Sequence, residues 1–129
     1  MLLGELEKLL LNYLWAEGSA DAKQAHSFFQ ESRGGSLNTI QSTLDRLFKK
    51  KLLNRTKSGH AFTYSPAVER KDLLGSLITD ITKELAQNDS DAILEAFIDI
   101  STQLDAKSLQ RLEDLIASRK KQNSHTHND

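Results

Sequence analysis

Four short polar side chains lie within five consecutive positions in the first half of the chain. They are Asn38, Thr39, Gln41 and Ser42. Side chains of this kind can reach base edges in a major groove, where Asn and Gln pair with adenine and Ser or Thr with several bases. The pattern predicts direct contact with duplex DNA, provided that one helix displays all four residues on an exposed face.

A cluster of positive charge surrounds these residues. Between residues 33 and 60 there are seven basic side chains and one acid, Asp45, although the whole chain has a net charge of −1. Phosphate affinity depends on the charge at the contact surface more than on the average. A solvated charged surface without a ligand is the alternative. The side chains predicted to lie where backbone phosphates pass are Arg46, Lys49, Lys50, Lys51 and Lys57.

Helical periodicity positions the four polar residues. Ser36 is a suitable cap for a helix that runs to about Lys51. Its inward residues are Ile40, Thr43 or Leu44, and Leu47, so the four polar residues face outward. Two earlier helices are predicted, one over about residues 2–16 and one from a cap at Ser19 to the break at residues 33–35.

The pattern changes to alternation after this helix. Residues 53–56 and 61–64 are predicted strands, joined by a turn over residues 57–60 in which Gly59 can adopt a positive φ. Pro66 ends the second strand. Three helices followed by a hairpin indicate a winged helix-turn-helix over residues 1–68.

The remaining segments are predicted to be helical over residues 69–121, with a disordered tail at 122–129. The fold class is thus mainly α with a small β-hairpin wing. The apolar stripes of these helices could complete a monomeric core, but a self-complementary dimer is the commoner solution. The predicted dimerisation residues are Leu77, Ile81, Leu94, Phe97, Leu109, Leu112, Leu115 and Ile116.

Composition excludes several classes of protein. The chain has no Cys, which removes disulfides, thiolate nucleophiles and Cys-ligated metals. No spacing marks a nucleophile elbow, a P-loop or a metal-binding helix, so we expect neither an enzyme nor a cofactor. His125 and His127 are too few for a metal site. Without an apolar run of about 20 residues or a signal-peptide pattern, we expect a cytoplasmic protein with no membrane partner.

Several segments together resemble the penicillinase and methicillin-resistance repressor (BlaI/MecI) family. The opening Leu3-Gly4-Glu5-Leu6-Glu7 with Leu14-Trp15 is similar to the start of that family. Residues 39–47 with Lys49-Lys50 resemble its recognition helix, and Lys57-x-Gly59 with Phe62-x-Tyr64-x-Pro66 resembles its wing. Residues 97–116 resemble its dimerisation region. The resemblance as a whole spans about residues 3–121.

The resemblance implies a homodimeric repressor that binds a palindromic operator, with interlocked C-terminal helices. By position, Asn38, Thr39, Gln41 and Ser42 become base-contacting candidates. Arg46, Lys49, Lys50, Lys57 and His60 become phosphate-contacting candidates. From its own context, His60 is equally compatible with a plain turn residue. The resemblance leaves the operator and any inducer or signalling partner open.

Two positions depart from the family pattern. Studied members are inactivated by cleavage at an Asn-Phe bond, where this chain has Ala96-Phe97. The resemblance therefore leaves open whether proteolytic induction applies to this chain. Lys51 stands where a Gly usually ends the recognition helix, which predicts an altered turn.

A winged helix that docks onto another protein is the alternative function. A docking surface of that kind should expose apolar side chains on the third helix, whereas Asn38, Thr39, Gln41 and Ser42 are polar. Fold alone does not separate the two functions, but the composition of this helix favours DNA.

Overall fold

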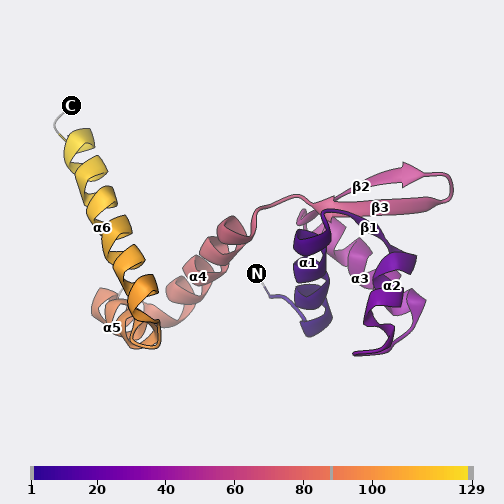
Figure 1. Ribbon diagram of the computed structural model, residues 1–129, viewed down its shortest axis with the longest axis horizontal. Helices are drawn as coiled ribbons and strands as arrows, with labels where there is room; N and C mark the ends of the chain where they lie inside the picture. The colour runs from indigo at the N-terminus through magenta and orange to yellow at the C-terminus, as the bar shows by residue number, and fades with distance from the viewer. Residues whose placement is uncertain (1, 88, 128–129) are drawn as a thin grey trace. The chain divides into compact units, whose positions relative to one another are not determined.

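The computed structural model describes residues 2–87 and 89–127. These residues contain six helices and a three-stranded sheet (Figure 1). The chain divides into two compact units, Met1–Asp80 and Ile81–Asp129. The first contains α1 (Glu5–Glu17), β1 (Ala20–Asp21), α2 (Ala22–Gln30), α3 (Leu37–Lys49), β2 (Leu53–Ser58) and β3 (Ala61–Pro66). Helix α4 (Arg70–Ala86) begins in the first unit and ends in the second, which also holds α5 (Ser90–Ser101) and α6 (Ala106–His127). None of these helices is both long and apolar enough to cross a bilayer.

Side-chain caps fix where α2 and α3 begin. The Oδ1 atom of Asp21 accepts from the Gln24 backbone N–H at 2.8 Å, and the Gln24 side chain accepts from the Asp21 N–H at 2.9 Å. Asp21 therefore caps α2 in place of the predicted Ser19. Ser36 caps α3 as predicted, because its Oγ accepts from the Thr39 N–H at 3.1 Å.

The three strands form one antiparallel sheet in the order β1-β3-β2. The predicted hairpin is confirmed, with Ser58 opposite Ala61 and a two-residue turn at Gly59 and His60. Gly59 has φ of 66°, which only glycine adopts without strain. Strand β1 has no counterpart in the sequence prediction and pairs Ala20 with Tyr64. Figure 1 shows the hairpin beside the three helices of the first unit.

One apolar core holds the first unit together. Helices α1 and α3 contribute most of it, and the strands close one side. Its most deeply buried large side chains are Leu10, Leu11, Leu14, Ile40, Leu44, Leu47 and Leu53. The first turns of α4 belong to this core too, because Leu73 is buried in it and Leu77 packs against it. The compact unit therefore extends to Asp80, beyond the domain end predicted at residue 68.

The turn after α3 departs from ordinary L-residue geometry. Helix α3 ends at Lys49 instead of about Lys51, and Lys51 has φ of 68°. A side chain in this left-handed region costs about 1 kcal/mol or more relative to glycine. Lys51→Gly should therefore raise the free energy of unfolding by about 1 kcal/mol, measured by urea denaturation. Lys51→Ala removes the same charge but keeps the strain, so a gain of equal size in that variant would contradict a backbone cause.

The second unit has helices with little core of their own. Asp89 caps α5 by accepting from the Ala92 N–H at 3.0 Å, and Asp105 caps α6 by accepting from the Ser108 N–H at 2.7 Å. Helix α6 continues to His127, which differs from the predicted disorder after residue 121; residues 128 and 129 lie outside the described residues. The large side chains left exposed are Ile81, Leu85, Ile93, Leu94, Phe97, Ile98, Ile100, Leu104, Leu115 and Ile116.

Candidate nucleic-acid interface

Helix α3 presents a polar face to solvent because its opposite face is buried. The buried side chains are Ile40, Thr43, Leu44 and Leu47. The predicted base-contacting residues Asn38, Thr39, Gln41 and Ser42 are all exposed, so the structure brings them together on one surface. Thr43 faces inward, and its Oγ1 donates to the Thr39 carbonyl at 2.7 Å.

The four exposed residues differ in their free hydrogen-bonding groups. The Thr39 hydroxyl lies 2.9 Å from the Ser36 Oγ, and the Ser42 hydroxyl donates to the Thr39 carbonyl at 3.2 Å. Among the described residues, the side-chain amides of Asn38 and Gln41 have no hydrogen-bond partner. An amide offers a donor and an acceptor side by side, the arrangement that matches the major-groove edge of adenine.

A groove connects α3 with the hairpin. It has a volume of about 450 Å³, and its polar lining residues include Gln41, Lys23 and His60. Lys23 is an exposed cation in the first turn of α2 that the sequence analysis did not single out. It lies well before the basic run in the chain, and only the fold brings it beside the hairpin turn. The groove thus has the Gln41 amide on one side, and the Lys23 ammonium, the His60 imidazole and the Asp21 carboxylate also line it.

Three predicted phosphate contacts lie exposed around this surface. The Arg46 guanidinium donates to the Thr43 Oγ1 at 3.2 Å. The Lys49 side chain is 73% exposed and lies 2.9 Å from the Asp45 carboxylate, and this hydrogen bond holds the pKa of Asp45 below its usual range. Lys57 is exposed on β2. These cations can meet an anion without first being drawn out of the core.

Lys50 occupies a different environment from its neighbours. Its Nζ lies 2.6 Å from the Glu7 Oε2 and donates to the Leu2 carbonyl at 3.1 Å. The carboxylate of Glu7 is nearly buried, and the pair joins the start of α1 to the end of α3. The charge of Lys50 is balanced by the nearly buried Glu7, although its own side chain is 32% exposed, and its predicted phosphate contact stays a prediction.

The same pair gives a prediction for acid stability. Burial alone would raise the pKa of Glu7, but hydrogen bonds from Lys50 and Gly4 outweigh it and bring the pKa below its usual 4.5. The ionised pair therefore contributes fully above that value, and its contribution is lost as the pH falls through the lowered pKa. At neutral pH, Glu7→Gln should lower the free energy of unfolding by about 2 kcal/mol.

The difference between the variant and the unaltered protein should shrink at acidic pH, because the amide introduced by Glu7→Gln does not titrate. The free energies of unfolding of both proteins are measured by urea denaturation, once at neutral pH and once at a pH below the ordinary glutamate pKa. Glu5→Gln is the matched control, since Glu5 is exposed in the same first turn. A Glu7→Gln deficit that stays constant with pH would show that shape, and not charge, matters at this position.

A second set of contacts fixes the hairpin to α3. The Arg55 guanidinium lies 3.9 Å from the centre of the Phe48 ring and 4.2 Å from that of Phe62. Its Nη1 donates to the Asp45 Oδ1 at 3.1 Å. We call Arg55 with Asp45, Phe48 and Phe62 the arginine clamp. Arg55 thus contacts two aromatic rings and one carboxylate, which the basic run in the sequence did not reveal.

The predicted dimerisation residues fall into two groups. Leu77 packs partly against the core of the first unit. The others belong to the second unit, where Leu109 and Leu112 are half-buried and the rest are exposed. Phe97, for example, is 51% exposed on α5. Side chains of this size on a helical surface mark a surface that another apolar surface can cover.

Comparison with known proteins places this fold among transcriptional repressors. The penicillinase repressor family matches residues 3–118. The transcriptional regulator BlaI of Mycobacterium tuberculosis is 27% identical over 111 residues, which are 84% of this chain and 80% of that protein. The penicillinase repressor of Staphylococcus aureus is 23% identical over 107 residues, or 83% of this chain and 84% of the relative.

A solved structure supports the same assignment for the first unit. The solution structure of the DNA binding domain of the repressor BlaI matches with a TM-score of 0.50 and 28% identity, over 54% of this chain and 85% of that domain. The family match covers most of the chain, and the expected fold class is confirmed. The chain therefore belongs to the penicillinase repressor family, and its first unit is a winged helix with the β2–β3 hairpin as its wing.

Proposed function

We propose that this protein is a DNA-binding transcriptional repressor that places α3 in the major groove of its operator. The observation that carries the proposal is the pair of unpartnered amides, Asn38 and Gln41, on a helix flanked by exposed cations. The repressor BlaI, whose DNA binding domain has the same fold as the first unit, supports the proposal. We assign base contacts first to these two amides, and then to Thr39 and Ser42, whose hydroxyls also serve the helix.

The phosphate contacts follow from the exposed charges. We assign them to Arg46, Lys49 and Lys57, with His60 and Lys23 on the groove beside α3. Lys50 is left out, because its partner Glu7 is nearly buried, whereas the Lys49–Asp45 pair is exposed to solvent. The wing then lies against the sugar-phosphate backbone next to the groove that α3 enters.

We also propose that two copies join through their second units and bind a palindromic operator. The exposed apolar residues of α4, α5 and α6 support this, since a self-complementary surface is the usual way to cover such helices. Two identical winged units related by a twofold axis require two half-sites, spaced by whole turns of the duplex. Occupation of a promoter by this dimer would block transcription.

The composition of α3 favours DNA over a protein partner. All of its residues lie in the described part of the chain, and none of its large apolar side chains is exposed. A protein-docking winged helix would need such side chains to bury. The surface of α3 instead offers exposed hydrogen-bonding groups.

The test compares one base-contacting and one phosphate-contacting variant. Operator fragments are captured from the region upstream of the protein's own gene, and binding is measured by electrophoretic shift at several salt concentrations. Gln41→Ala should cost about 1–3 kcal/mol and relax the preference at one base pair. Lys57→Gln should weaken binding to all DNA sequences alike. It should also reduce the salt slope, which is the slope of log affinity against log salt concentration, by about one.

Glu31→Gln is the control for these variants, because Glu31 is exposed at the end of α2 and lies outside the surface described. It should leave both affinity and salt slope close to those of the unaltered protein. Failure of the unaltered protein to retain any upstream fragment at low salt would refute DNA binding. A salt slope that Lys57→Gln leaves unchanged would refute the placement of the wing.

A further inference from the structure

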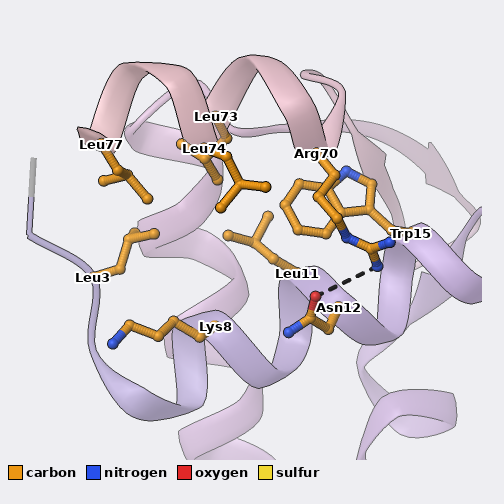
Figure 2. A pocket seen from close by; sticks show the side chains of 9 residues that line it. All are labelled: Leu3, Lys8, Leu11, Asn12, Trp15, Arg70, Leu73, Leu74 and Leu77. Carbon is orange, nitrogen blue, oxygen red and sulfur yellow. Dashed lines mark hydrogen bonds between the residues drawn. The ribbon is translucent and has the colours of Figure 1, made fainter. Parts of the chain in front are cut away.

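An apolar hollow lies between α1 and the first turns of α4, entirely within the first unit (Figure 2). Its volume is about 310 Å³, at the lower end of the range of small-molecule sites. Its apolar walls are Leu3, Leu11, Trp15, Leu73, Leu74 and Leu77. Leu74 is 51% exposed, so the hollow is open to solvent on the α4 side.

The rim of the hollow is positively charged. Figure 2 shows Lys8 and Arg70 from the two helices, with Asn12 between them on α1. The Arg70 guanidinium lies 5.0 Å from the centre of the Trp15 ring and donates to the Asn12 Oδ1 at 3.5 Å, a neutral partner. Among the described residues, neither Lys8 nor Arg70 pairs with a carboxylate. Two cations are thus left without a counter-charge beside an apolar floor.

The Trp15 indole adds only an apolar surface. Its Nε1 already donates to the Val68 carbonyl at 3.0 Å, so no polar atom of the ring is left to bind a ligand. A ligand for this hollow therefore needs an apolar body and one anionic end that reaches the rim. A neutral or cationic amphiphile would leave Lys8 and Arg70 unpaired.

We propose that the hollow is a binding site for a small amphipathic carboxylate, and that its occupancy regulates operator binding. The regulatory part rests on the proposed DNA-binding function. Helix α4 is common to both units, and the hollow lies where its first turns pack against α1 of the winged unit. A ligand seated there changes how the winged unit holds α4, the helix through which it is joined to the other half-site.

Trp15 makes the binding step directly measurable, because it is the one tryptophan of the chain. The full-length protein is titrated with octanoate, octanol and octyltrimethylammonium, and Trp15 emission is recorded without DNA. Octanoate should give a saturable change, and the other two amphiphiles should bind about fivefold more weakly, as expected for an exposed ion pair. Equal responses to all three, or no response, would overturn the proposed site.

Two matched variants test the charged rim. Lys8→Gln should weaken octanoate binding about fivefold. Lys71→Gln removes an exposed cation of α4 outside the hollow and should bind octanoate as the unaltered protein does. Equal loss in both variants would overturn the assignment of Lys8. A Trp15 emission that changes with protein concentration and not with octanoate would assign the hollow to a second copy of the chain instead.

Regulation is tested by repeating the electrophoretic shift with and without saturating octanoate. A change in operator affinity of at least about fivefold in the unaltered protein, lost in Lys8→Gln at the same octanoate concentration, would support it. Octanoate that binds at Trp15 but leaves operator affinity unchanged would overturn the regulatory part. DNA binding is measured first without octanoate, so failure of the proposed repressor function is visible separately.

Discussion

Phe97→Asp is expected to leave the protein monomeric at concentrations where the unaltered chain is dimeric. Phe97 is half-exposed in the single chain and lies among apolar neighbours on α5, which we propose to be covered by the second copy. A carboxylate buried there costs about 3 kcal/mol, which is roughly a hundredfold in the dissociation constant of the dimer. A twofold interface contains the substitution twice, so this is a lower bound. Sedimentation equilibrium measures the change.

The loss of dimer should carry over to DNA. A monomer holds one half-site, so the shift of a palindromic duplex should disappear at concentrations that saturate it for the unaltered protein. Glu95→Ala is the control, because Glu95 is exposed on α5 between two other acids, Asp91 and Asp99, one turn to either side. If the Phe97→Asp protein remains dimeric, the proposal that the second unit forms the dimer interface is refuted.

The elements of the winged unit could be predicted because their signals are local. Helix α3 has a cap at Ser36 and an apolar period that places Ile40 and Leu47 on one side. The hairpin has alternating residues around Gly59, whose positive φ suits a two-residue turn. Each of these features depends on residues fewer than about eight positions apart, within the reach of sequence reasoning.

Elements that depend on distant partners could not be predicted. Strand β1 is two residues long and exists because Ala20 pairs with Tyr64, far along the chain. The cap of α2 shifted from Ser19 to Asp21 for the same reason, since the strand occupies the residues before the helix. No periodicity exists in a segment this short.

The candidate site also combines features that local sequence signals predict with features that depend on distant partners. Sequence reasoning identified which residues of α3 face outward, but not that Ser36 and Thr39 share a hydrogen bond. Charge counting placed Lys50 with the phosphate contacts, because it does not reveal that Glu7 lies 2.6 Å from its Nζ. The partner of a charged side chain is a property of the fold, and it decides whether that charge is available to DNA.

Arg55→Ala is expected to lower both the stability of the winged unit and its affinity for DNA, although Arg55 is assigned no contact with DNA. The arginine clamp joins α3 to both strands, through Asp45 and Phe48 on one side and Phe62 on the other. Removal of the guanidinium should lower the free energy of unfolding by about 1–2 kcal/mol, the range of a desolvated cation–π contact. A wing less firmly held against α3 should bind the operator about tenfold more weakly.

The salt dependence of binding separates this positioning role from direct contact. Arg55→Ala should leave the salt slope of operator binding unchanged, because the guanidinium packs on two rings and is held by Asp45. Lys57→Gln, two residues along the same strand, should reduce the slope by about one. Arg55→Lys should resemble Arg55→Ala, since an ammonium keeps the charge but lacks the flat surface that packs on Phe48 and Phe62. Full recovery of operator affinity in Arg55→Lys, or a reduced salt slope in Arg55→Ala, would show that Arg55 contacts a phosphate directly.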